Sequence, residues 1–305
     1  MLTLAAGLDY VDLNFLGIPE VIATAVLHHA SGVALIDPGP STTHQSLKES
    51  LRRKGISITD VRQILLTHIH LDHAGVTGTL VRENPGIEVL VHERGATHMI
   101  DPSKLLASAG RLYGADMDRL WGDFIPVPAA RVKALKGEEH IVAAGRELEV
   151  AYTPGHASHH VSYFDGASRV AFVGDTAGIR RTGRDYIMPP TPPPDIDLDA
   201  WRTSEDRILS WEPETLFLTH FGPFHGARMH FQDMTERLGV WSGIVRRLLA
   251  NPALDEDGRQ QAFVSEALLD LKRKLGEREA ERYGRAGRLD YSWQGLSRYW
   301  RKKQG

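Results

Sequence analysis

Runs of apolar residues separated by turn-forming residues dominate the first part of the chain. Residues 21–37 read VIATAVLHH, then Ala-Ser-Gly, then VALID, and two such runs around a turn predict a β-hairpin. Residues 61–67 and 87–92 are two further apolar runs with the length of a buried strand. Between them and the hairpin, residues 41–55 carry apolar positions at helical spacing behind Ser and Thr caps. This order predicts alternating strands and helices.

A second strand-rich region follows at residues 131–175. It ends in the run HHVSYF-DGAS-RVAFVGD, whose central turn signal predicts another hairpin. The proline-rich residues 188–195 must form a loop, because proline fixes φ and lacks the backbone donor that a helix or a central strand needs. A helix capped by Asp199 then precedes one more short strand at residues 215–220.

Helical periodicity replaces the strand pattern in two places. Residues 98–124 have apolar positions typical of a helical insert. From about residue 225, apolar residues recur every three or four positions, and a second helix carries its apolar face at residues 263–275. We therefore predict a main domain of residues 1–224 and a helical extension of residues 225–305. The extension either packs on the domain or pairs two chains as a homodimer.

The composition narrows the class of protein. Of the 305 residues, 42% are hydrophobic and 25% are charged, and the formal net charge of −3 favours neither a nucleic-acid nor a membrane partner. No apolar run reaches the roughly 18 residues of a membrane span. The N-terminal run lacks the basic start of a signal peptide, so we expect a cytoplasmic protein. Cysteine is absent, which excludes disulfides, thiolate metal ligands and a cysteine nucleophile.

Four residues able to bind a metal lie within six positions, directly after the predicted strand at residues 61–67. They are His68, His70, Asp72 and His73. A single His-x-His pair is common by chance, but the complete His-x-His-x-Asp-His run is not. Imidazole and carboxylate groups are ligands for zinc, and without sulfur ligands iron, manganese and cobalt stay open as well.

This run is followed by TPGH at 153–156, GDT at 174–176 and TH at 219–220. In residue type and order, the set resembles the metallo-β-lactamase superfamily over about residues 20–222, within the branch of the glyoxalase II and lactonase metallo-hydrolases. The resemblance implies an α/β fold, a four-layer αβ/βα sandwich with metals at one edge, where loops leave two facing sheets. Residues 1–224 would then be the catalytic domain.

The resemblance also implies a ligand set for two divalent metal ions, most readily zinc, with iron or manganese as alternatives. The first metal would be held by His68, His70 and His156, the second by Asp72, His73 and His220, with Asp175 as the bridge. Two such ions share a hydroxide, lower its pKa and polarise the bond it attacks, which leads to hydrolysis. Asp72 would in addition take or relay a proton. Asp37, in the run IDPG, either orients a ligating histidine or forms the turn before Pro38.

The fold does not select the substrate. The resemblance favours a small-molecule ester, lactone or thioester, with phosphodiester or phosphotriester cleavage as a variant. An oxidoreductase like the mononuclear-iron persulfide dioxygenases is the second class, and a binding protein that has lost catalysis is the third. β-Lactamase activity is disfavoured, because Asp175 is present and cysteine is absent.

Substrate contacts are harder to predict than metal ligands. Arg180, Tyr186 and His225 follow the motifs closely and are our candidates, although a solvated basic loop or ordinary packing is the more common explanation for such residues. The other spare histidines near the motifs, His159, His160 and His230, fit the same two explanations. We expect the insert at residues 98–124 and the loop at residues 188–195 to wall or cover the substrate pocket.

Overall fold

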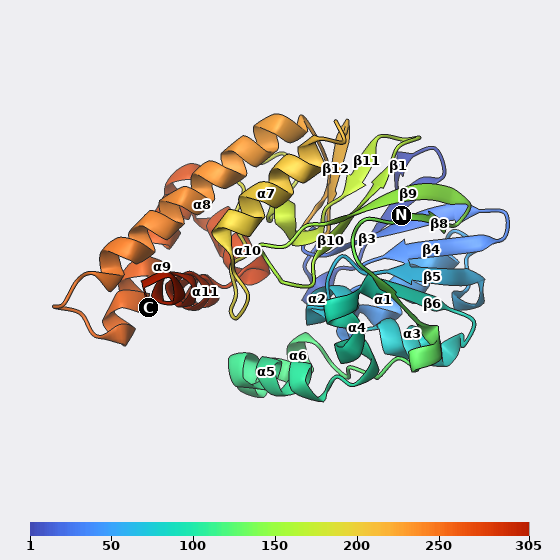
Figure 1. Ribbon diagram of the computed structural model, residues 1–305, viewed down its shortest axis with the longest axis horizontal. Helices are drawn as coiled ribbons and strands as arrows, with labels where there is room; N and C mark the ends of the chain where they lie inside the picture. Colours follow the sequence, from blue (N-terminus) through green and yellow to red (C-terminus); the bar gives the residue numbers. More distant parts are fainter. Residues whose placement is uncertain (305) are drawn as a thin grey trace.

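The computed structural model describes residues 1–304 and contains two facing β-sheets (Figure 1). The seven-stranded sheet has the order β1-β2-β3-β4-β5-β6-β7, and the six-stranded sheet has the order β13-β12-β11-β10-β9-β8. The first sheet consists of β1 (Leu2–Ala5), β2 (Leu8–Asp12), β3 (Ala23–His29), β4 (Gly32–Ile36), β5 (Val61–Leu65), β6 (Glu88–His92) and β7 (Val132–Leu135). The second consists of β8 (His140–Ala143), β9 (Arg146–Tyr152), β10 (Val161–Asp165), β11 (Val170–Phe172), β12 (Thr215–Leu218) and β13 (Gly222–His225).

The core between the sheets follows from the apolar runs of the sequence. Leu27, Leu65 and Leu90 of the first sheet pack against Tyr163 and Phe217 of the second, and all five are buried. Successive side chains of a strand point to opposite faces, so runs that are apolar at every position can bury both faces. Both predicted hairpins form, as β3 with β4 and as β10 with β11.

Helices cover the outer face of each sheet and complete the four layers. The helices of the first half are α1 (His44–Arg52), α2 (Leu71–Ala74), α3 (Thr77–Glu83), α4 (Glu93–Ile100), α5 (Ser103–Tyr113) and α6 (Met117–Leu120). Those of the second half are α7 (Leu198–Leu209), α8 (Ala227–Leu249), α9 (Glu256–Leu275), α10 (Glu277–Ala286) and α11 (Leu289–Gln304). Short 3-10 turns lie at Phe15–Gly17, Ser41–Thr43, Ile58–Asp60, Gly114–Asp116, Ala129–Arg131 and Gly174–Ala177. In Figure 1, α1, α3 and α4 lie beside the first sheet, whereas α7 and α8 lie beside the second.

One edge of the sandwich gathers the ends of strands from both sheets. The pair β4 and β5 is parallel, as is the pair β11 and β12, so each pair ends at the same edge. Two backbone hydrogen bonds join the sheets there, from Ala23 N to Thr219 O (2.8 Å) and from Val161 N to Thr67 O (2.8 Å). The residues that follow these strands are therefore brought together.

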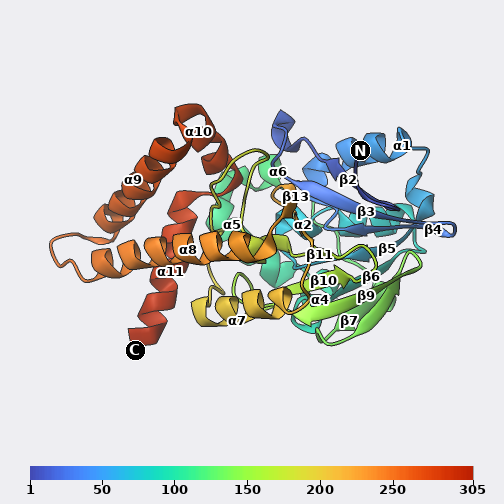
Figure 2. The same ribbon diagram turned by 90° about the horizontal axis from the view of Figure 1, so that it is seen from above.

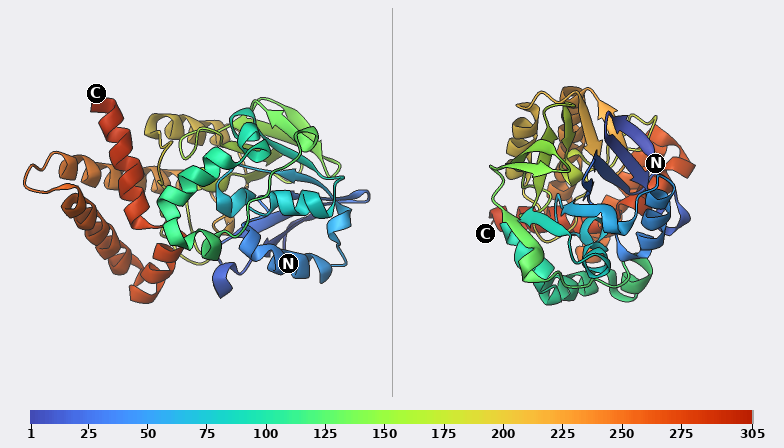
Figure 3. Two further views of the ribbon diagram at one scale, coloured as in Figure 1. Left: turned by 90° about the horizontal axis from the view of Figure 1, so that it is seen from below. Right: turned by 90° about the vertical axis from the view of Figure 1, so that its right-hand side faces the viewer.

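The C-terminal helices share a hydrophobic core with an earlier segment. Trp241, Phe263 and Trp293 are buried together with Tyr186 and Trp201. Figures 1 and 2 show α9, α10 and α11 beyond one end of the sandwich, and Figure 3 shows α5 and α6 (teal-green) between the sandwich and these helices. The apolar faces of the helices are thus covered within the chain. The division into a main domain of residues 1–224 and an extension of residues 225–305 stays a prediction.

Two local features differ from the sequence prediction. The cap of α7 is Asp197, whose carboxylate accepts hydrogen bonds from the backbone amides of Asp199 and Ala200 (both 3.1 Å), so Asp199 lies in the first turn instead. Residues 222–225 form an additional strand, β13, before α8 begins at Ala227. Within residues 1–304, no helix is long and apolar enough to cross a membrane.

Candidate metal centre

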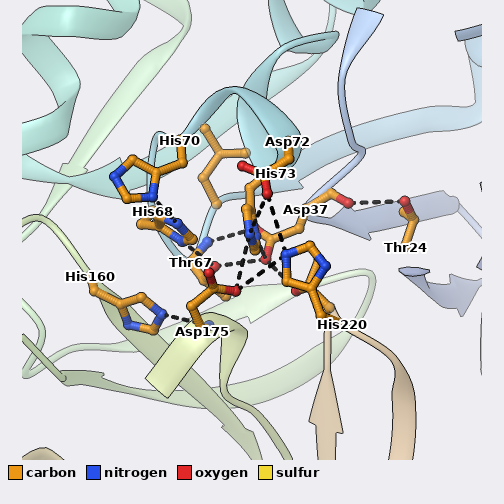
Figure 4. A network of polar contacts seen from close by, with 12 residues as sticks. Thr24, Asp37, Thr67, His68, His70, Asp72, His73, His160, Asp175 and His220 are labelled. Carbon is orange, nitrogen blue, oxygen red and sulfur yellow. Dashed lines mark hydrogen bonds and ion pairs between the residues drawn. The ribbon is translucent and has the colours of Figure 1, made fainter. Parts of the chain in front are cut away.

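The seven predicted ligands converge at the edge where the strands end. His68 and His70 follow β5, and Asp72 and His73 lie in the short helix α2 behind them. The remaining three follow β9, β11 and β12 respectively, and these are His156, Asp175 and His220. Figure 4 shows the side chains that come from β5, α2, β11 and β12 pointing toward one another.

The first group consists of three histidine nitrogens. Nδ1 of His70 lies 2.9 Å from Nε2 of His68 and 2.9 Å from Nε2 of His156. The three residues form one of the clusters whose ligand atoms all lie within 4.8 Å of one another. This membership is the one that the sequence analysis predicted for the first metal.

The second group combines a carboxylate with two histidines. Oδ2 of Asp72 lies 3.3 Å from Nε2 of His220 and 3.8 Å from Nε2 of His73. These residues form a second cluster of potential ligand atoms within 4.8 Å. The sequence analysis proposed these three residues for the second metal, and a third cluster, His68, His73 and Asp175, takes one histidine from each group.

Asp175 lies between the two groups. Its Oδ2 is 3.3 Å from Nε2 of His156, in the first group. Its Oδ1 is 3.2 Å from Nε2 of His73 and 3.5 Å from Nε2 of His220, in the second group. One carboxylate oxygen faces each group, which is the arrangement expected of a bridging ligand.

Hydrogen bonds on the far side of three imidazole rings set their tautomers. Each ring places Nδ1 against an oxygen that only accepts hydrogen bonds, so Nδ1 carries a proton, and once Nε2 has lost its own proton its lone pair is directed into the site. The three contacts are His73 to Asp37 Oδ2 (2.8 Å), His156 to Pro190 O (2.8 Å) and His220 to Val21 O (2.7 Å).

Asp37 is the centre of a buried network behind the site (Figure 4). Besides the contact with His73, its carboxylate accepts hydrogen bonds from the Thr67 amide (2.8 Å), the Thr67 hydroxyl (2.7 Å) and the Thr219 hydroxyl (2.8 Å). Its backbone also has a φ of 50° in the turn after β4. Asp37 therefore both orients His73 and forms the turn, so the two interpretations of the sequence are compatible.

Burial and neighbouring charges shift the pKa values of the clustered histidines and aspartates in different directions. Burial and then the neighbouring histidines lower the pKa of His68 well below its usual value, and burial lowers the pKa of His70 to about 4. Burial alone would raise the pKa of Asp175, but His73 and His220 outweigh it and hold that pKa well below its usual range. His68 and His70 are therefore neutral at pH 7 while Asp175 is ionised, the states in which these groups bind a metal.

Two buried polar atoms test whether a cation fits this cluster. Nε2 of His73 and Oδ1 of Asp175 are inaccessible to solvent, and although they face each other at 3.2 Å, neither makes a hydrogen bond within residues 1–304. Unsatisfied buried polar atoms are costly. A divalent cation satisfies an imidazole lone pair and a carboxylate oxygen together, so this donor set fits a metal.

A cavity of about 630 Å³ opens beside the cluster. His70, Asp72, His156, Asp175 and His220 lie on its wall. Both segments predicted as walls contribute to it: residues 113 and 119–121 come from the helical insert, and residues 190–192 come from the proline-rich loop. The C-terminal helices α10 and α11 contribute as well, which the sequence did not indicate.

The three predicted substrate contacts are not among the residues described as lining this cavity. Arg180 donates to the carbonyl of Arg184 (2.8 Å), and the hydroxyl of the buried Tyr186 lies 3.2 Å from Asp270. His225 is exposed at the end of β13. Residues 179 and 188 pair with each other, so the intervening chain folds back toward the C-terminal helices. All three therefore lie outside the described lining of this cavity.

The other spare histidines have packing roles. His160 is buried, with Nδ1 2.9 Å from the Thr153 hydroxyl, and Nε2 of His230 lies 2.7 Å from the carbonyl of Ala177. His159 is buried with its Nδ1 3.5 Å from the amide of Ile69. None of the three is among the described residues that line the cavity.

Sequence comparison identifies the chain's relatives. The model of the metallo-beta-lactamase superfamily matches residues 18–220. The metallo-beta-lactamase fold-containing protein ST1585 of Sulfurisphaera tokodaii is 26% identical over 220 residues, which are 71% of this chain and 78% of that protein. A hydroxyacylglutathione hydrolase of Buchnera aphidicola is 26% identical over 159 residues, 52% of this chain and 48% of the hydrolase.

Structure comparison extends the likeness beyond the sheets. The metallo-beta-lactamase family protein TTHA1429 of Thermus thermophilus has a TM-score of 0.73 at 21% identity, covering 99% of this chain and 95% of that one. The crystal structure of ST1585 has a TM-score of 0.65 at 22% identity and covers 95% and 98%. At these identities the likeness shows the fold alone, and it includes the C-terminal helices.

Proposed function

The chain belongs to the metallo-beta-lactamase superfamily, and on that premise we propose that it is a hydrolase that uses two divalent metal ions to cleave an ester, lactone or thioester. The observation that carries the proposal is the position of Asp175, with one carboxylate oxygen 3.3 Å from His156 and the other 3.2 Å from His73. A carboxylate between two complete ligand groups is suited to a pair of ions rather than to one.

The donor set supports zinc as the metal. Imidazole nitrogens and carboxylate oxygens are its usual ligands where cysteine is absent, and iron and manganese accept the same groups. His68, His70 and His156 would hold the first ion, Asp72, His73 and His220 the second, and Asp175 both. When bound, such ions polarise the bond to be cleaved and lower the pKa of water toward neutrality.

Asp72 is our candidate for handling the proton. Its side chain is 22% exposed and lies on the cavity wall, whereas Asp175 is 5% exposed. Burial alone would raise its pKa, but His73 and His220 outweigh it and lower the pKa to about 2. The carboxylate is therefore ionised at pH 7. We propose that its Oδ1 accepts the proton released from water and relays it to the leaving group.

The second ligand group weighs against the oxidoreductase alternative. Asp72, His73 and His220 are all present and clustered, so the chain offers a full set of ligands for a second ion, which a mononuclear iron enzyme would use less fully. The cavity volume is typical of small-molecule sites. Similarity to a hydroxyacylglutathione hydrolase supports a thioester among the candidate bonds. Phosphodiester or phosphotriester cleavage by the same residues is the alternative, and the experiment must distinguish it from ester, lactone and thioester cleavage.

The test is metal analysis combined with a substrate panel. We expect reconstituted protein to contain two zinc, iron or manganese ions per chain by plasma mass spectrometry. We also expect it to hydrolyse chromogenic esters, lactones or thioesters faster than phosphodiesters. One iron per chain together with oxygen consumption on a persulfide would contradict the hydrolase and identify an oxidoreductase. Hydrolysis of phosphodiesters alone would show that the cleaved bond is a phosphodiester rather than an ester, lactone or thioester.

Asp37→Asn is expected to weaken metal binding by roughly 10- to 100-fold, the usual effect of removing a partner that orients a ligating histidine. An asparagine amide offers a donor where the carboxylate accepts from His73, Thr67 and Thr219. The measurement is a competitive titration against a zinc-binding dye. Asp9→Asn is the matched control, because Asp9 pairs with His28 (3.2 Å) on β2 and β3. Equal affinity in both variants would show that Asp37 does not orient a ligand.

A further inference from the structure

One wall of the cavity is a row of aromatic rings from three distant parts of the chain. Phe15 stacks on Trp121 with ring centroids 5.6 Å apart. Tyr113 contacts the edge of Trp121 (5.1 Å) and of Tyr291 (5.4 Å). All four residues line the cavity that contains the ligand cluster. Such rings offer a large apolar surface with little conformational entropy to lose on binding.

The row is held in place by contacts between its segments. The hydroxyl of Tyr291, on α11, donates to the carbonyl of Leu112, at the end of α5 (2.9 Å). Trp121 is 9% exposed and Phe15 is 5% exposed, so both rings are mostly covered by the protein. The helical insert and the C-terminal helix therefore form this wall together. A preformed apolar wall favours an apolar ligand group.

The charged side chains on the cavity wall outside the ligand cluster are already paired. Arg119 forms an ion pair with Asp116 (3.0 Å), and Arg288 forms one with Asp290 (2.6 Å). Each partner lies within three residues of its arginine, so the positive charges are offset locally. The wall is therefore better suited to a hydrocarbon group than to an anionic one.

Gly284 leaves space on the part of the wall formed by α10. A Cβ added at Gly284 meets no atom within 4 Å, whereas one added at the next lining glycine, Gly287, would collide with Met188. Gly284 lies inside a helix and lines the cavity. The absence of a side chain there leaves room for a bound group.

Building on the proposed hydrolase function, we propose that the substrate carries an apolar acyl group, a medium-length alkyl chain or an aryl group, that lies along the aromatic row. The open space at Gly284 sets the upper limit of its length. The substrate class is therefore an apolar acyl ester or thioester.

Gly284→Leu tests the proposal without removing any existing contact, and leucine favours a helix over glycine. With p-nitrophenyl esters from acetate to octanoate, we expect kcat/KM of the unmodified protein to rise by up to about fourfold per methylene that leaves water. In Gly284→Leu, kcat/KM for the octanoate should fall by about 15-fold, the effect of excluding about two methylenes, and that for the acetate should change less than about twofold. Gly239→Leu, at an exposed and open position of α8, is the matched control.

A binding measurement separates this inference from the proposed function. Octanamide, which is not an ester, should quench the tryptophan fluorescence of the metal-loaded protein more strongly than acetamide, and Gly284→Leu should weaken that binding. If no ester, lactone or thioester is hydrolysed but octanamide binding depends on Gly284, the hydrolase proposal fails and the apolar site stands. Equal affinity for both amides, or an equal loss of kcat/KM on the short and long esters, overturns the inference.

Discussion

Asp175→Asn is expected to reduce hydrolysis by about three orders of magnitude or more, the loss of several kcal/mol of transition-state stabilisation. The variant keeps the shape of the side chain but replaces one carboxylate oxygen with an amide nitrogen, which cannot bind a cation. Because the two oxygens face different ligand groups, either orientation of the amide weakens one of them. We expect metal content to fall from two ions to at most one per chain, measured by plasma mass spectrometry beside steady-state kinetics.

The control is Asp185→Asn, which makes the same chemical change at a fully exposed aspartate a short distance along the chain. It should retain both metals and full activity. An Asp175→Asn protein with two tightly bound ions and undiminished turnover would remove the bridging role. A variant with two ions but little activity would show that Asp175 acts on the reaction rather than on metal binding.

Arg181→Met is expected to lower the free energy of unfolding by about 3 kcal/mol, as when one partner of a buried ion pair is removed. Arg181 is 3% exposed. Its guanidinium donates to the carbonyls of Pro19 (3.1 Å) and Glu20 (2.8 Å), and it pairs with the carboxylates of Glu20 (3.1 Å) and Glu279 (3.3 Å). Methionine fills similar space but leaves the carbonyls of Pro19 and Glu20 without this donor. Urea denaturation followed by circular dichroism measures the effect.

The same substitution should also raise KM more than it lowers kcat. The N-terminal loop that Arg181 holds continues to Val21 and Ile22, which line the cavity, and α10, which carries Glu279, lines it at Gly284. Arg184→Met is the control, because Arg184 is half exposed and pairs with the same Glu279 at 3.6 Å, which predicts a change below about 1 kcal/mol. Comparable destabilisation in both variants would contradict a special role for the buried arginine.

The clustering of the proposed metal ligands could be predicted because the resemblance named the seven residues and each one follows an apolar run that had to become a strand. His68, Asp175 and His220 all come directly after β5, β11 and β12. Parallel pairing then brings the ends of neighbouring strands to one edge. The role of Asp37 was open in the sequence, because an aspartate before Pro38 forms a turn in either case. The structure decided the question, because the carboxylate of Asp37, after β4, contacts His73, which follows the neighbouring strand β5.

The sequence predicted two segments of the cavity wall, residues 98–124 and 188–195, but the single residues proposed as substrate contacts lie outside the described lining, because they were chosen by nearness along the chain. Arg180 and Tyr186 follow the bridging aspartate, but the pairing of residues 179 and 188 turns that segment toward the C-terminal helices, where Tyr186 is buried. The residues that do line the cavity, among them Tyr113 and Tyr291, have no motif and lie far apart in the sequence.

The sequence by itself therefore determined most strands and helices of the main domain and the crowded set of histidines after one strand, since periodicity and residue spacing are local signals, whereas the grouping of the ligands was implied by the resemblance. Only the tertiary structure decided which side chains surround the substrate, where Asp37 directs its carboxylate and that α10 and α11 complete the cavity. The physical reason is the range of the interactions. Strand formation and metal-ligand spacing depend on neighbouring residues, whereas a cavity wall depends on how separate helices pack, and that packing is decided by the whole core.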